Sequence, residues 1–171
     1  MSVKEVKTNA MRILESEGIN FETGYYECDE FIDGVHTADA LGLPHEMVYK
    51  TLVTVGHSKN YYVFVIPIEK EIDLKKAAKA VGEKSVEMLP LKDVTNVTGY
   101  IRGGCTAVGM KKHYVTRIDE SAILQDAIYV SGGKRGIQIK LHPDDLLKVT
   151  KAEYADVTCL LYTSPSPRDT R

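Results

Sequence analysis

Two glycine-rich stretches and one lysine hold the residue types in this sequence that are suited to chemistry. The first stretch, GYIRGGCTAVGMKK at residues 99–112, combines four glycines with one cysteine and two lysines. The second, YVSGGKRG at 129–136, places Ser131 before a Gly-Gly pair and two basic residues. Lys50 stands at the start of the apolar run KTLV. Glycines let backbone N–H groups approach a ligand closely, so the three features together predict a binding cleft.

The first stretch has three candidate roles: a phosphate-binding loop, the surroundings of a cysteine nucleophile, and a tight turn. Met110 follows Gly109 where a P-loop needs lysine, and the GxGxxG spacing of a dinucleotide-binding turn is absent. Cys105 as a nucleophile requires a base, and the nearest histidine, His113, lies on the next expected strand. A lone cysteine is more often a small buried apolar residue. The remaining prediction is a loop that offers backbone N–H donors.

Each of the other two features also has two interpretations. Lys50, beside Tyr49 and Leu52, is partly desolvated and holds a carbonyl or phosphate oxygen tightly, or it extends from the strand end into solvent. The Gly132-Gly133 turn lines a cleft, or it is a hairpin turn with a charged tip at Lys134 and Arg135.

Composition limits the class of protein. The chain has 171 residues, 43% of them hydrophobic, and a net charge of −2, which fits one globular domain and disfavours nonspecific nucleic-acid binding over the whole surface. No apolar run approaches the ~20 residues of a membrane span, and the first residues lack a signal-peptide core. The three cysteines, Cys28, Cys105 and Cys159, form no CxxC pair, so neither a disulfide framework nor a zinc site is expected. We expect a reducing, cytoplasmic setting, and no metal, cofactor, membrane or DNA partner.

Helical and strand patterns interleave along the chain without a strict βαβ repeat. Apolar spacing and caps predict helices over 3–17, 37–43, 73–82, 90–99 and 142–150, with a helical turn at 120–125. Apolar or alternating runs predict strands over 19–27, 50–55, 61–68, 85–89, 113–119, 127–133 and 134–141. The expected fold class is therefore α/β of the mixed α+β type, a mixed sheet with flanking helices.

The composition changes abruptly after Thr158. The remaining stretch, CLLYTSPSPRDTR, has two Ser-Pro steps and no periodicity, and it resembles translated sequencing-adaptor sequence joined to a gene fragment. We therefore predict one domain over residues 1–158 and a non-native or disordered tail over 159–171.

Four linked segments resemble the YbaK/EbsC family. They are VYKTLV, LKKAAKAVGEKSVEML, TGYIRGGCTAVGMKK and IYVSGGKRGIQIKLHPDDLLKVT, in the family's order and spacing, within a resemblance that spans residues 10–158. The resemblance implies a partly barrel-like mixed sheet with flanking helices, as in the prolyl-tRNA synthetase-associated domain. It also implies a deacylase, a hydrolase or lyase that removes cysteine wrongly attached to tRNA(Pro). An editing site is needed because one pocket separates amino acids of similar size by only ~1–3 kcal/mol.

The resemblance also implies roles for individual residues. Lys50 corresponds to the family's essential lysine, with Tyr26 nearby, while the thiol of the substrate, rather than a protein nucleophile, attacks the ester. Backbone donors at Gly103 and Gly104 would contact the aminoacyl carbonyl or the terminal adenosine. The remaining residues expected at the substrate are Thr106, Ser131, Gly132 and Gly133. Contacts to tRNA are expected from Lys111, Lys112, Lys134 and Arg135.

This chain departs from the family at two adjacent residues of the first loop. Thr106-Ala107 stands where the family commonly has Ser-Pro, so the ring that would stiffen the turn is missing. The expected partners are mischarged tRNA(Pro) and prolyl-tRNA synthetase. Two alternatives stay open: the same fold acting on Ala- or Ser-tRNA, and a non-catalytic module that binds aminoacyl-tRNA or regulates a synthetase.

Overall fold

The computed structural model describes residues 7–25, 42–101, 104–134 and 136–160. The α-helices are α1 (Asn9–Ser16), α3 (Leu74–Val81), α4 (Leu91–Thr98) and α5 (Pro143–Thr150), with short 3₁₀ helices η1 (His45–Met47) and η2 (Glu120–Leu124). The first five strands are β1 (Glu22–Tyr25), β2 (Tyr49–Gly56), β3 (Tyr61–Pro67), β4 (Lys70–Ile72) and β5 (Val86–Met88). The others are β6 (Val115–Asp119), β7 (Ile128–Ser131), β8 (Ile137–Leu141), β9 (Glu153–Ala155) and β10 (Thr158–Leu160).

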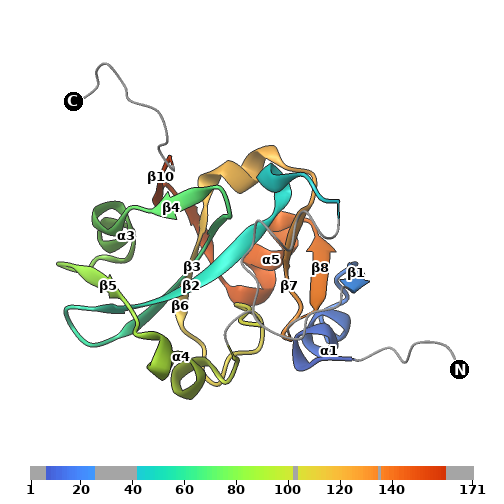
Figure 1. Cartoon of the computed structure of the whole chain (residues 1–171), viewed down its shortest axis with the longest axis horizontal. Helices are drawn as coiled ribbons and strands as arrows, with labels where there is room; N and C mark the ends of the chain where they lie inside the picture. The colour runs from blue at the N-terminus through green and yellow to red at the C-terminus, as the bar shows by residue number, and fades with distance from the viewer. Residues whose placement is uncertain (1–6, 26–41, 102–103, 135, 161–171) are drawn as a thin grey trace, which may run out of the picture.

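The largest sheet has five strands in the order β5-β2-β3-β6-β9 (Figure 1). Strand β2 runs antiparallel to both β3 and β5, whereas β3 and β6, and β6 and β9, run parallel. This mixture of parallel and antiparallel pairs agrees with the interleaved helices and strands of the sequence. The mixed α+β class expected from the sequence is confirmed.

A smaller sheet of three antiparallel strands, β1-β8-β7, lies beside the first. The two sheets meet at a parallel bridge between Val48, just before β2, and Tyr129 of β7. Strands β10 and β4 form a separate antiparallel pair. Among the residues that the structure describes, these sheets do not close into a barrel, so the expected barrel-like character is limited to the β2–β7 junction.

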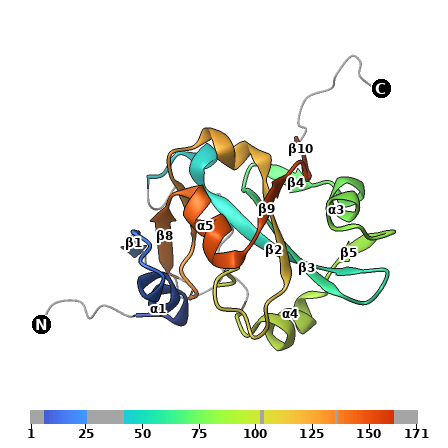
Figure 2. The ribbon, with the colours of Figure 1, turned by 180° about the vertical axis from the view of Figure 1, so that it is seen from behind.

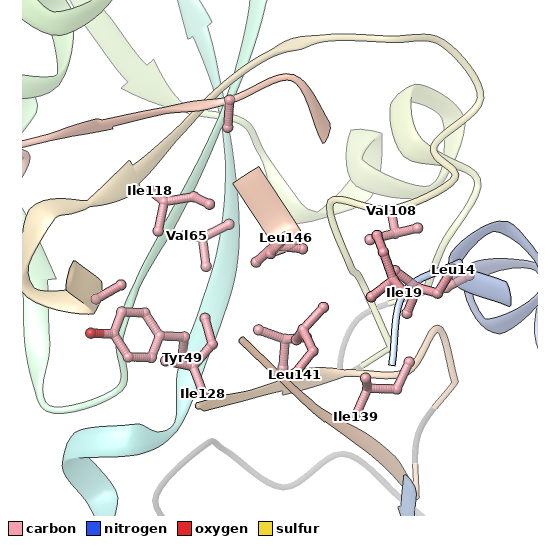
Figure 3. Close-up of a cluster of buried hydrophobic side chains, with 14 of the residues drawn as sticks. Leu14, Ile19, Tyr49, Val65, Val108, Ile118, Ile128, Ile139, Leu141 and Leu146 are labelled. Carbon is pink, nitrogen blue, oxygen red and sulfur yellow. The ribbon is translucent and has the colours of Figure 1, made fainter. Parts of the chain in front are cut away.

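The main hydrophobic core lies between the two larger sheets and α5 (Figure 3). It includes Tyr49 and Val65 of the five-stranded sheet, Ile128 and Ile139 of the three-stranded sheet, and Leu146 of α5. Figure 2 shows α5 in front of the five-stranded sheet, which it covers on this face. Alternate residues of β3, such as Phe64, pack instead against α3 on the other face. Both faces of β3 are thus buried, as its continuous apolar run predicts.

Most predicted elements are present, and the largest error in a boundary is at the first helix. The first helix was expected from residue 3 but begins at Asn9, because the Thr8 side chain accepts a hydrogen bond from the Met11 N–H and caps the helix there. The sequence pattern missed the three-residue strands β4, β9 and β10 and the helix η1. Most of the helix expected over 37–43 lies outside the described residues.

No helix in the described ranges is long and apolar enough to cross a membrane. Residues 158–160 form β10 and pair with β4, so the first residues after the expected domain boundary take part in a sheet. The division into a domain and a tail stays a prediction, since residues 161–171 are outside the part of the chain that is described.

Candidate functional site

Lys50 is the second residue of β2, and its side chain is half-buried. Its neighbour Tyr49 belongs to the main core, and successive side chains of a strand point to opposite faces. Lys50 therefore lies on the face away from the main core, together with Val48, which packs in a small separate cluster with Ile68 and Tyr129.

The side chains of strand β7, next to β2, also alternate between the main core and the opposite face. Ile128 and Val130 are in the main core, so Tyr129 and Ser131 lie on the opposite face, the face of Lys50. Because Val48 and Tyr129 form a parallel bridge, Lys50 and Ser131 each follow the bridged pair by two residues in the same direction. The structure thus brings the predicted lysine and the predicted serine to neighbouring positions at the β2–β7 junction.

Strand β8 extends this face by two further polar residues. Gln138 pairs directly with Ser131, and Lys140 pairs with Tyr129, while the residues between them point into the main core. The Lys140 ammonium lies 5.9 Å from the centre of the Tyr129 ring. We call the surface formed by Lys50, Tyr129, Ser131, Gln138 and Lys140 the lysine face.

The second glycine turn leaves β7 directly from the lysine face. The Gly132 N–H donates to the Ile137 carbonyl at 2.8 Å, and the Gly133 N–H donates to Ser131 Oγ at 3.2 Å. A Cβ at position 132 would lie 2.5 Å from Ile137 Cγ2, closer than side chains approach, so this close crossing of the chain requires glycine. The predicted hairpin between β7 and β8 is confirmed.

The first glycine loop is held together from within. The Tyr100 hydroxyl donates to the Val108 carbonyl at 2.6 Å, and the buried Thr106 hydroxyl accepts from the Val108 N–H at 3.3 Å. Gly109 has a positive φ of +77°, which favours glycine, and it lies against Asn9 and Ile13 of α1. Thr106, expected at the substrate, therefore directs its hydroxyl to its own loop.

The two glycine loops are neighbours in space. The Thr8 hydroxyl donates to the Gly132 carbonyl at 2.6 Å. A Cβ built at Gly133 would lie 3.5 Å from both Thr8 Cβ and Tyr100 Cε1, and one built at Gly109 would lie 3.0 Å from the Tyr100 hydroxyl oxygen. The start of α1 and the Tyr100 ring thus join the two loops that the sequence marks as one candidate cleft.

The first loop contacts β2 on the side opposite to the lysine face. Cys105 and Met110 pack against the cluster that contains Val53, and strand alternation directs Val53 and Lys50 to opposite faces. Tyr100 of this loop lies beside Gly133, whereas Cys105 and Met110 lie on the face of β2 opposite to Lys50.

Cys105 has the environment of a structural residue. Burial raises the pKa of its thiol to about 11, although a hydrogen bond with Thr98 opposes that shift. Nε2 of His113, the histidine nearest in sequence, lies 2.9 Å from the Thr150 carbonyl oxygen at the end of α5. Cys105 is partly buried and packs against an apolar cluster, which favours a structural residue over a nucleophile.

Three residues of the lysine face, Tyr129, Gln138 and Lys140, were not among the site residues expected from the sequence, and Gln138 is the most informative of them. The side chain of Gln138 is buried, and its Oε1 has no hydrogen-bond partner among the residues that the structure describes. In the sequence, the IQIKL run alternates apolar and polar residues, which is typical of a strand with one exposed face. Only the three-dimensional neighbours show that this polar residue is buried.

The expected tRNA contacts are exposed where they are described. Lys111, Lys112 and Lys134 all lie at the surface, and Lys111 Nζ donates to the Asn96 carbonyl at 3.0 Å. Arg135 lies outside the described residues, as do Tyr26 and Gly103.

Two surface hollows lie apart from the lysine face. One, of about 570 Å³, is lined by residues such as Lys70, Glu120 and Asp156. The other, of about 360 Å³, lies between α1 and β1. Within the described ranges, no group of three or more histidine, cysteine or carboxylate side chains is arranged to hold a metal ion.

Comparisons with known proteins identify the family of this chain. Residues 34–149 match the family model described as the aminoacyl-tRNA editing domain. The chain is 46% identical over 153 residues to EbsC of Enterococcus faecalis, a protein provisionally named as a Cys-tRNA(Pro)/Cys-tRNA(Cys) deacylase. That alignment covers 89% of this chain and 93% of EbsC.

Two solved structures share the fold. One is a provisionally assigned trans-editing enzyme for prolyl-tRNA synthetase, with a TM-score of 0.77 and 24% identity, covering 89% of this chain and 98% of that one. The other is the hypothetical protein APE2540, with a TM-score of 0.80 and 22% identity, covering 86% and 97%. From the match to the family model and the identity to EbsC, the chain belongs to the aminoacyl-tRNA editing domain family, in its YbaK/EbsC branch.

Proposed function

We propose that this protein hydrolyses Cys-tRNA(Pro), with Lys50 on the lysine face as the side chain that binds the aminoacyl ester. The observation that carries the proposal is the parallel bridge between Val48 and Tyr129, because it sets Lys50 beside Ser131 on one face. The name of the 46% identical relative EbsC supports cysteine as the amino acid and tRNA(Pro) as one carrier.

In the proposed reaction the thiol of the substrate attacks its own ester. The family resemblance implies that the attacking sulfur comes from the substrate, and Cys105, which is partly buried and has a raised thiol pKa, is consistent with that. The cysteinyl thiol loses its proton, and its sulfur forms a bond to the ester carbonyl carbon. The bond from that carbon to the ribose oxygen breaks, and the ribose oxygen takes up the proton. Water then opens the cyclic thioester and releases free cysteine.

In this scheme Lys50 stabilises rather than attacks. An ammonium at the ester carbonyl oxygen opposes the negative charge that develops there during attack. The N–H groups of Gly104, Gly132 and Gly133 already donate to the Ile101 carbonyl, the Ile137 carbonyl and Ser131 Oγ, so they are not counted among the donors in this scheme. The basic residues Lys111, Lys112, Lys134 and Arg135 would contact the tRNA backbone near its acceptor end, and prolyl-tRNA synthetase would supply the mischarged substrate.

A panel of mischarged tRNAs tests the proposal. Purified protein is mixed with Cys-, Ala- and Ser-tRNA(Pro), and the release of each amino acid is followed over time. Rapid loss of cysteine is expected, with serine and alanine lost no faster than in buffer, because neither side chain carries a thiol.

The other outcomes identify the alternatives. Hydrolysis of Ala- or Ser-tRNA at a rate similar to that of Cys-tRNA would contradict substrate-thiol assistance and favour a deacylase of different specificity. Binding of Cys-tRNA(Pro) without release of cysteine would favour a non-catalytic binding module, for which the Thr106-Ala107 replacement is the best support.

A further inference from the structure

The side-chain oxygen of Gln138 is a buried polar atom with no hydrogen-bond partner among the described residues. The residue is 8% exposed. Buried polar atoms in native proteins are nearly always paired, and an unpaired acceptor lowers stability. An exception of this kind needs an explanation, and a ligand that supplies the missing donor is one.

The position of Gln138 directs the amide to the lysine face. Its strand neighbours Ile137 and Ile139 point into the main core, so Gln138 points to the other side. Ser131 is its direct partner across the β7–β8 pair, and Ser131 is in turn beside Lys50 at the junction with β2. The unpartnered amide oxygen therefore belongs to the same surface as the lysine.

The other groups of this surface are mainly donors. Lys50 and Lys140 are donors only. Ser131 Oγ already accepts from the Gly133 N–H, whereas the Gln138 oxygen has no donor. An aminoacyl ester has the complementary set: its carbonyl and phosphate oxygens accept, and its α-ammonium is its strongest donor.

We propose that Gln138 Oε1 accepts a hydrogen bond from the α-ammonium group of the bound aminoacyl ester and so selects substrates with a free amine. This inference rests on the proposed function for the identity of the ligand. The amide is neutral, so it binds the ammonium without forming a salt bridge to Lys50 that would withdraw the lysine from the ester. Gln138 is a specificity residue in this account, while Lys50 acts at the reacting carbonyl.

Two non-hydrolysable probes test the inference by calorimetry. One is cysteine joined by an amide to 3′-amino-3′-deoxyadenosine, and the other is the same compound without the α-amine. Wild-type protein is expected to bind the amine probe about 10- to 100-fold more tightly, as a hydrogen bond to a charged group would give. Gln138→Met, which keeps the shape and removes the amide, is expected to bind both probes with equal affinity.

Two further variants complete the design. Gln125→Met is the matched control, because Gln125 is the residue that follows η2 and is not part of the lysine face, and this variant should keep the wild-type preference. Gln138→Glu retains an acceptor and should keep or enlarge the preference, which covers the case in which Gln138→Met fails to fold. Equal binding of the two probes by wild-type protein, or an unchanged preference in Gln138→Met, would overturn the inference.

The probes also separate this inference from the proposed function. They cannot be hydrolysed, so their binding does not depend on turnover. A preference for the amine that depends on Gln138, in a protein that fails to deacylate any tRNA of the panel, would refute the proposed activity and leave the inference intact. Deacylation of Cys-tRNA(Pro) by a protein that binds both probes equally would support the proposed activity and refute the role of Gln138.

Discussion

Cys105 shows how the surroundings of one residue decide its role. It lies in a glycine-rich loop near two lysines, a sequence context that suits a nucleophile. In the structure it packs in a cluster with Val53 and Met110, and burial raises the pKa of its thiol to about 11. At neutral pH the thiol is therefore protonated and unreactive.

This environment predicts slow alkylation of Cys105. With Cys28 and Cys159 replaced by serine, Cys105 at pH 8 should react with iodoacetamide about a hundredfold more slowly than an ordinary thiol, since a pKa raised by about two units leaves that much less thiolate. The rate should rise steadily as the pH increases toward 11. Rapid, complete alkylation of the folded protein at pH 7 would contradict the assignment of Cys105 as a buried structural residue.

Lys50 and Gln138 differ in how far the sequence could predict them. Lys50 begins a conspicuous apolar run, and its motif carries the family resemblance, so its location was predictable. Gln138 occupies an ordinary polar position of an alternating strand. It lies on β8, the central strand between β1 and β7, and pairing between strands distant in sequence is not visible in local periodicity.

At the scale of elements, Thr8 links helix α1 to the second glycine turn. Its hydroxyl accepts from the Met11 N–H as the helix cap and donates to the Gly132 carbonyl from a buried position. One side chain thus fixes the start of a helix and the backbone of a turn that lies 124 residues away in sequence.

Thr8→Ala should destabilise the protein by about 1–2 kcal/mol, because it removes a helix cap and leaves the buried Gly132 carbonyl without its donor. Urea unfolding followed by circular dichroism measures the change. Thr8→Ser, which keeps the hydroxyl, should remain close to wild type. Equal losses in the alanine and serine variants would show that the methyl group, rather than the two hydrogen bonds, is what matters.

Strong local signals explain which elements were predictable. Helix α3 is bounded by the Asp73 cap and by Gly82 in the left-handed conformation, and both were read from the sequence. The sequence pattern places the start of the first helix too early, because Val3 and Val6 continue its apolar spacing. In the structure the helix begins after Thr8, which is its N-cap. Strands β4, β9 and β10 have three residues each and exist through their partners, so no local pattern identifies them.

At the scale of the whole molecule, the two larger sheets share one hydrophobic core. Residues of β2, β3, β6, β7 and β8 meet α5 in a single cluster (Figure 3), so the β2–β7 junction is held from its inner side. The outer side of that junction is the lysine face. The mixed fold class could be predicted from the order of elements, but the junction could not, because it depends on one bridge between residues 81 positions apart, Val48 and Tyr129.

The release of cysteine from Cys-tRNA(Pro) by wild-type protein and by Lys50→Ala, measured in single turnover, tests the central claim most directly. Lys79→Ala is the matched control, since Lys79 is exposed on α3, on a helix that contributes nothing to the lysine face. The account predicts rapid release by wild type and by Lys79→Ala, and release by Lys50→Ala slowed about a hundredfold or more, the scale of losing one charge-stabilising group. Full activity in Lys50→Ala would contradict it.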